Sequence, residues 1–192
     1  MSGNGSYSPS SGFTPSTAGT YWWYASYAGD SNNGASNSGC GSGMIKTVVF
    51  HYQPDAQIKL AGDTSYLGVG IINTTGAGQT RITTTTPGKS RTFDLRFVNA
   101  GTHSDAIAVH GCKSSSGFTV QYFKGTTNVT TGVTAGTYKT ITLAAGASKF
   151  LKLKIAVSSK ASPGKLKTCA VSASSNRDPT SQDVVKGKVK VG

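Results

Sequence analysis

The residues of this chain that are able to do chemistry are few, and their spacing favours structural roles. The three cysteines are Cys40, Cys112 and Cys169, and none of them belongs to a CxxC motif. The three histidines do not stand at zinc-binding spacing from these cysteines. Every acidic residue is an aspartate, and the lack of glutamate weakens the case for paired-carboxylate catalysis. We therefore expect no enzyme activity, no metal site and no cofactor.

Cys112 and Cys169 are the candidates for a disulfide bond. The Gly-, Ser- and Thr-rich composition is typical of exported proteins, whose environment permits disulfides. The alternative is a pair of buried free thiols, which is a common state for cysteine. Cys40 is left over in either case, so it is free or pairs with a cysteine outside this chain.

Positive charge dominates the chain, with 19 Lys and Arg against 7 acidic residues and a formal net charge of +12. Many lysines alternate with or flank aliphatic residues, which predicts a basic surface made of Lys152, Lys154, Lys165, Lys167, Lys186, Lys188 and Lys190. One interpretation is solvated outer faces and protected sheet edges. The other is weak, salt-sensitive binding of an anionic polymer. Few of the basic residues are arginine and no recognition motif is present, so we expect no sequence-specific nucleic-acid binding.

Two stretches of the same design predict the centre of the fold. Within residues 88–99, Phe93, Leu95 and Phe97 alternate with polar side chains, and this period of two indicates a strand with one buried face. Residues 146–155 repeat the design, including the Gly-x-Ser lead-in. The repeat predicts two core strands of one antiparallel sandwich, whose second strand buries Leu151, Leu153 and Ile155.

Short strands separated by Gly, Pro, Asn and Asp turns predict an all-β protein. The expected strands span residues 56–60, 66–71, 80–85, 91–98, 105–110, 118–123, 138–143, 149–157, 166–172 and 184–191. Together they predict one antiparallel β-sandwich over residues 54–192. No apolar run is long enough to span a membrane.

The first third of the chain has a different character. Residues 1–18 predict a flexible arm or one ordered by a partner, because they are rich in Gly, Ser, Thr and Pro. Residues 19–52 predict a small β segment built around an aromatic strand at 19–28. One face of that strand carries Tyr21, Trp23 and Tyr27, and the other carries Trp22 and Tyr24.

These five aromatic side chains are the candidate interface residues. Trp22 and Tyr24 could stack on sugar rings or enter a protein interface. A third interpretation is that missing partner strands bury both faces of the strand. We expect intermolecular packing, because soluble monomers avoid large exposed apolar patches.

The GDSNN turn that follows the aromatic strand has two interpretations, a calcium site or an Asx-type turn.

Both parts of the chain resemble immunoglobulin-like repeats of secreted and surface proteins of bacteria. In the first part the stretch GTYWWYASYAGD resembles the closing half of such a repeat. In the second part the resemblance lies in PGKSRTFDLRFVNAGTHSDAIAV, GFTVQYFKGTTNVTTGVTAGTY, LAAGASKFLKLKIAV and DPTSQDVVKGKVKV, in that order. The resemblance implies a partial immunoglobulin-like β segment at residues 19–52 and an immunoglobulin-like β-sandwich at residues 54–192. It also implies a stalk, spacer or adhesive module without catalytic residues.

We therefore expect a non-catalytic structural or assembly module that is extracellular or on the cell surface and contacts other protein subunits. The alternatives are a virion component, such as a phage head-decoration or fibre protein, and a carbohydrate-binding module.

Overall fold

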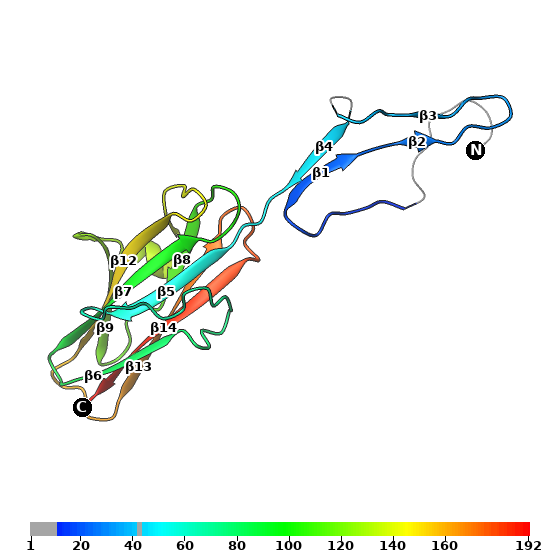
Figure 1. Ribbon diagram of the computed structural model, residues 1–192. Coiled ribbons are helices and arrows are strands. Elements are labelled where there is room, and N and C mark those ends of the chain that lie inside the picture. Colours follow the sequence, from blue (N-terminus) through cyan, green and yellow to red (C-terminus); the bar gives the residue numbers. More distant parts are fainter. Residues whose placement is uncertain (1–10, 42–43) are drawn as a thin grey trace. The chain divides into compact units, whose positions relative to one another are not determined.

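The structure, a computed structural model, describes residues 11–41 and 44–192, and its regular elements are nearly all strands (Figure 1). The chain forms two separate units, residues 1–51 and residues 52–192. The first contains β1 (Gly19–Trp23), β2 (Ser26–Tyr27), β3 (Ser36–Asn37) and β4 (Ile45–Val49). The second contains β5 (Pro54–Leu60), β6 (Thr80–Thr85), β7 (Ser90–Asn99), β8 (Ile107–Gly111), β9 (Phe118–Lys124), β10 (Thr127–Asn128), α1 (Thr130–Ala135), β11 (Tyr138–Lys139), β12 (Ser148–Val157), β13 (Leu166–Ser175) and β14 (Gln182–Val191).

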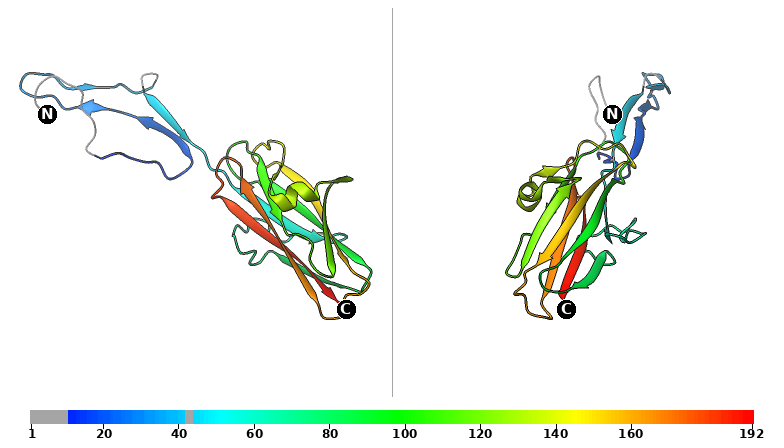
Figure 2. Two further views of the ribbon diagram at one scale, coloured as in Figure 1. Left: turned by 180° about the vertical axis from the view of Figure 1, so that it is seen from behind. Right: turned by 90° about the vertical axis from the view of Figure 1, so that its left-hand side faces the viewer.

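The second unit is a β-sandwich of two five-stranded sheets, so the all-β prediction is confirmed. One sheet has the order β10-β9-β12-β7-β5, and the other has the order β11-β8-β13-β14-β6. The two layers face each other across the core (Figure 2). All neighbouring strands run antiparallel except β14 and β6, which run parallel. None of the described helices is long and apolar enough to cross a membrane.

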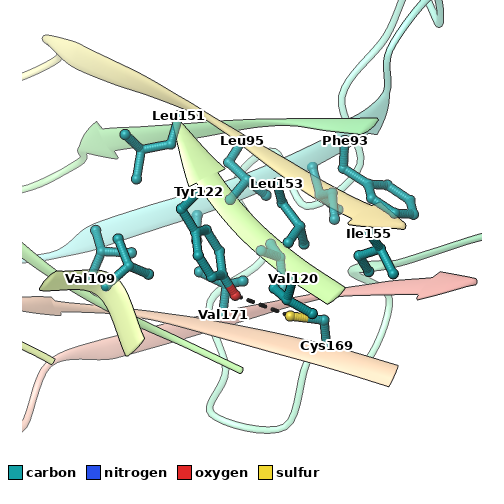
Figure 3. Close-up of a cluster of buried hydrophobic side chains, with 14 of the residues drawn as sticks. Phe93, Leu95, Val109, Val120, Tyr122, Leu151, Leu153, Ile155, Cys169 and Val171 are labelled. Atoms are coloured by element: carbon teal, nitrogen blue, oxygen red, sulfur yellow. Dashed lines mark hydrogen bonds between the residues drawn. The ribbon is translucent and has the colours of Figure 1, made fainter. Parts of the chain in front are cut away.

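The two stretches of repeated design are neighbouring strands at the centre of the first sheet. Leu95 of β7 lies opposite Leu151 of β12, and Phe93 lies opposite Leu153. These side chains are at most 2% exposed, and all six residues predicted for the core are buried. They pack against Val171 and other residues of the facing sheet (Figure 3).

Three local predictions of strands were wrong. Residues 66–71 form no strand, because Gly68 and Gly70 adopt positive φ and leave Leu67 with a single bridge to Ile58. The strand expected at 138–143 is limited to β11. The aromatic strand expected at 19–28 is divided into β1 and β2.

The central pair of strands leads to a prediction about stability. Leu95→Ala should lower the free energy of unfolding by about 2–5 kcal/mol, because it opens a cavity in a close-packed core. Urea denaturation of the variant beside the wild-type protein measures this difference. A matched exposed change, Ile141→Ala, should have little effect because Ile141 is 63% exposed. Equal losses in the two variants would contradict the core assignment.

Candidate interaction surface

The first unit is built around a two-stranded ribbon of β1 and β4, hereafter the aromatic ribbon. Its register places Trp22 opposite Lys46 and Trp23 opposite Ile45. Because side chains alternate along a strand, Tyr21 and Trp23 share one face and Trp22 lies on the other. The predicted alternation of the aromatic residues is therefore found in β1. Tyr27 lies outside β1, in the short strand β2.

The chain before β1 lies partly over one face of the ribbon. The ring of Phe13 packs 6.1 Å from that of Tyr21 and 6.0 Å from that of Trp23, measured between centroids. The Tyr21 hydroxyl also donates a hydrogen bond of 2.8 Å to the Thr17 carbonyl oxygen. Residues 11–18 thus contact the ribbon, whereas residues 1–10 of the predicted arm lie outside the described residues. Sequence reasoning missed Phe13, although it stands out as an aromatic residue in a polar stretch.

The opposite face of the ribbon is open. Trp22 on this face is 54% exposed, and Tyr24, which follows the end of β1, is 50% exposed. The Lys46 ammonium lies over the Trp22 ring, 5.7 Å from its centroid, as a cation–π contact requires. Val48 on the neighbouring strand is also exposed. This face therefore presents aromatic and aliphatic surface that the described residues leave uncovered.

No residue of the first unit is buried among those that the structure describes at 11–41 and 44–51. The described part of this unit therefore has no buried core of its own. β1 and β4 pair only with each other in the described chain, so each strand also has an open outer edge. An isolated two-stranded ribbon is marginally stable in water. Its stability must therefore depend on additional contacts.

Asp30, in the turn after β2, is hydrogen-bonded within the turn itself. Asp30 accepts hydrogen bonds from the Asn32 and Asn33 backbone amides and from the Tyr27 hydroxyl. This is the Asx-type turn, one of the two interpretations of the sequence. The Tyr27 hydrogen bond, together with the backbone donors, lowers the pKa of Asp30 to about 2. The described residues contain no cluster of three or more His, Cys, Asp or Glu side chains that could hold a metal ion.

The predicted basic surface is divided between the two faces of the sandwich. Lys152 and Lys154 project from the outer face of the sheet that contains β12. Lys186, Lys188 and Lys190 project from β14, on the outer face of the other sheet. These lysines are exposed or half-buried, and they do not form one continuous patch.

Lys165 and Lys167 lie near the beginning of β13 and have different environments. Lys165 is exposed. The Lys167 ammonium donates hydrogen bonds to the Lys113 carbonyl oxygen at 2.7 Å and to the Ser115 hydroxyl at 3.1 Å. Desolvation lowers the pKa of Lys167. Lys167 therefore stabilises the loop that follows Cys112 and is a poor candidate for binding a polymer.

The predicted disulfide is confirmed, since Cys112 and Cys169 are bonded with their Cα atoms 5.2 Å apart. The Tyr122 hydroxyl lies 3.1 Å from the Cys169 sulfur and donates to the Cys112 carbonyl oxygen (Figure 3). Gly111 leaves room for this ring, because a Cβ there would lie 2.3 Å from the Tyr122 hydroxyl. Cys40 is free and exposed in the first unit.

Comparisons with known proteins provide no family. No family model matches the chain, and no curated protein matches it. Among solved structures, a family 123 glycoside hydrolase from Clostridium perfringens is 9% identical, with a TM-score of 0.48 over 72% of this chain and 27% of that one. The secreted serine protease VesC from Vibrio cholerae is 16% identical, with a TM-score of 0.38 over 59% of this chain and 22% of that one. The chain thus spans about a quarter of the length of these two structures.

A PapD-like domain of human CEP192 is 9% identical, with a TM-score of 0.36 over 72% of this chain and 85% of that one. At such identities and TM-scores these likenesses carry no argument about function. The resemblance to bacterial immunoglobulin-like repeats therefore stays a prediction. The chain is an all-β protein whose second unit is a disulfide-bonded sandwich.

The disulfide leads to a prediction about stability. It joins residues separated by 57 positions, so replacing both cysteines by alanine should cost about 4 kcal/mol in the chain-entropy model. Denaturant unfolding of this variant and of the wild-type protein, both without reductant, measures the difference. Mass mapping of non-reduced peptides is the control. Free thiols at both positions, or a bond between Cys40 and either cysteine, would show the pairing to be wrong.

The Asp30 turn leads to a prediction about pH. The pKa of Asp30 in the folded protein is lowered to about 2 from its ordinary value of 3.8, so its hydrogen bonds stabilise the turn above pH 4. This contribution should be lost as pH falls through about 2. NMR titration of the Asp30 carboxyl and of the Asn32 and Asn33 amides follows the change. A midpoint near 4 would mean that the turn does not hold the charged carboxylate.

Proposed function

We propose that this chain is a non-catalytic structural module whose aromatic ribbon binds a neighbouring protein subunit. The observation that carries the proposal is a ribbon with large exposed aromatic side chains and no buried residue in the described unit around it. Soluble proteins rarely leave such a surface uncovered unless it is an interaction site. A protein subunit supplies both missing components, apolar surface for the faces and backbone groups for the edges.

The environment of Trp22 favours a protein partner over a sugar. Lys46 lies over the Trp22 ring, so part of the ring face that would stack on a sugar is in contact with a cation. Tryptophan and tyrosine are also the residues most enriched among the energetic centres of protein interfaces. The exposed side of the ribbon extends across both strands to Val48, which suits an extended interface.

The charge distribution favours an apolar contact. Asp30 and Lys46 are the only acidic and basic side chains before His51, so the first unit is neutral while the sandwich carries the whole excess of +12. Electrostatic steering therefore contributes little at the ribbon, and binding must come from apolar burial and strand pairing. The lysines of the sandwich lie on two opposite faces. They support at most a weak, salt-sensitive contact with an anionic polymer.

The disulfide suits an oxidising compartment such as the cell exterior. Together with the resemblance to bacterial immunoglobulin-like repeats, it supports a place in a secreted or surface assembly. In that setting the sandwich serves as the stable body of a subunit, and the first unit serves as its connector.

A substitution in the ribbon tests the proposal. Trp22→Thr should weaken assembly at least about tenfold, because it removes a central aromatic contact. Phe150→Thr is the matched control, since Phe150 is 53% exposed on the sandwich and Trp22 is 54% exposed. Sedimentation velocity over a wide concentration range measures assembly. A wild-type protein that stays monomeric at high concentration and with its natural neighbours would refute the proposal.

Both tryptophans of the chain lie in the ribbon, so tryptophan fluorescence reports on this surface without a contribution from the sandwich. We expect the emission of the wild-type protein to shift to shorter wavelength as subunits assemble. We also expect deletion of residues 1–50 to leave a folded sandwich that no longer assembles.

A further inference from the structure

The sandwich has one group of exposed aliphatic side chains that its fold does not explain. Leu67, Val69, Ile71 and Ile72 lie within six residues in the connection between β5 and β6 (Figure 1), and they are between 38% and 59% exposed. We name residues 67–72 the aliphatic segment. Single exposed apolar residues are normal, whereas four within six residues are a candidate interaction surface.

Backbone hydrogen bonds to the sandwich hold the aliphatic segment in place. The backbone amides of Leu67 and Gly70 donate to the Ile58 carbonyl oxygen and the Asp55 carboxylate, at 2.8 Å and 3.0 Å. The amide of Asn73 donates to the Asp183 carboxylate at 3.0 Å. Hydrogen bonds at both ends therefore fix the segment with its aliphatic side chains in the solvent.

Asp183 is the principal anchor of this connection. It is fully buried and accepts hydrogen bonds from the backbone amides of Ala56, Asn73 and Val184 and from the Gln79 side-chain amide. The bonds range from 2.7 Å to 3.0 Å. Because the segment is ordered in advance, a partner that docks on it loses little conformational entropy.

The segment is also an uncharged area on a strongly basic unit. No charged residue occurs between Asp63 and Arg81. The other exposed apolar residues of the sheets differ in this respect, because Ile82, Phe150 and Leu166 each lie directly opposite a lysine or an arginine of the neighbouring strand. Two copies of a sandwich with this charge repel each other, so a contact between copies is favoured where both surfaces are neutral.

We propose that the aliphatic segment is the docking site for the aromatic ribbon of a second copy of this chain. The inference rests on the proposed function, since it names the partner of the same ribbon. The two surfaces match in kind, because each is apolar, exposed and free of excess charge, and the +12 charge of the remaining surface disfavours other contacts between copies. The interface joins two different patches, so it is heterologous and each subunit can bind one neighbour on each side.

Two variants that each remove one side of the interface test this inference. The ribbon variant is Trp22→Thr with Tyr24→Thr, and the segment variant is Val69→Ser with Ile72→Ser. We expect each variant alone to be monomeric where the wild-type protein forms oligomers that grow with concentration. An equimolar mixture should form a dimer and nothing larger, because the segment variant keeps an intact ribbon and the ribbon variant keeps an intact segment. Sedimentation velocity measures the masses, and fluorescence of the segment variant's ribbon should shift only in the mixture.

The matched control for the segment variant is Ile82→Ser with Ile141→Ser, which removes two exposed aliphatic side chains elsewhere on the sandwich. It should assemble like the wild-type protein. A segment variant that still assembles, beside a ribbon variant that does not, would overturn this inference and leave the proposed function standing. A mixture that remains monomeric would overturn it as well. A wild-type protein that is monomeric at every concentration would refute the docking between copies. If it also failed to bind its natural neighbours, the proposed function itself would be refuted.

Discussion

The packing of β7 and β12 against the facing sheet is the contact on which the rest of the molecule depends. Phe93 and Leu153 face each other on these strands, and both are fully buried. The alternation that directs them inward also directs Lys152 and Lys154 outward, so core formation and surface charge are set by the same pattern. The sandwich can therefore be strongly basic at no cost to its interior.

Much of this unit was predictable because period-two alternation identifies both a strand and its buried face. The prediction failed where backbone geometry outweighs that pattern. Residues 66–71 alternate apolar residues with glycine, as a strand could, but the positive φ of Gly68 and Gly70 interrupts the extended backbone and leaves a single bridge to β5. The anchoring of this connection by Asp183 depends on residues 127 and 110 positions apart from it, and no local pattern reveals such contacts.

The candidate site was predictable in part for the same reason. The aromatic alternation around Trp22 and Trp23 identified a strand and its two faces, but not the pairing of β1 with β4. The basic surface was less predictable, because the sequence does not show that Lys152 and Lys186 lie in different sheets. The role of Lys167 was missed because its contacts at the beginning of β13 depend on the loop that follows Cys112.

The Ala56–Asp183 hydrogen bond has a mechanical consequence. It places the beginning of β5 beside the beginning of β14, and β14 then runs eight residues further to Val191, roughly 26 Å at the usual strand rise. The chain therefore enters the sandwich at one end of the strands and leaves it at the other. Tension between these two points acts along β5 and β14, so it loads many hydrogen bonds between neighbouring strands at the same time. A pull perpendicular to a strand end would instead break these hydrogen bonds one after another. The resistance of the sandwich to such a load depends on its unfolding rate.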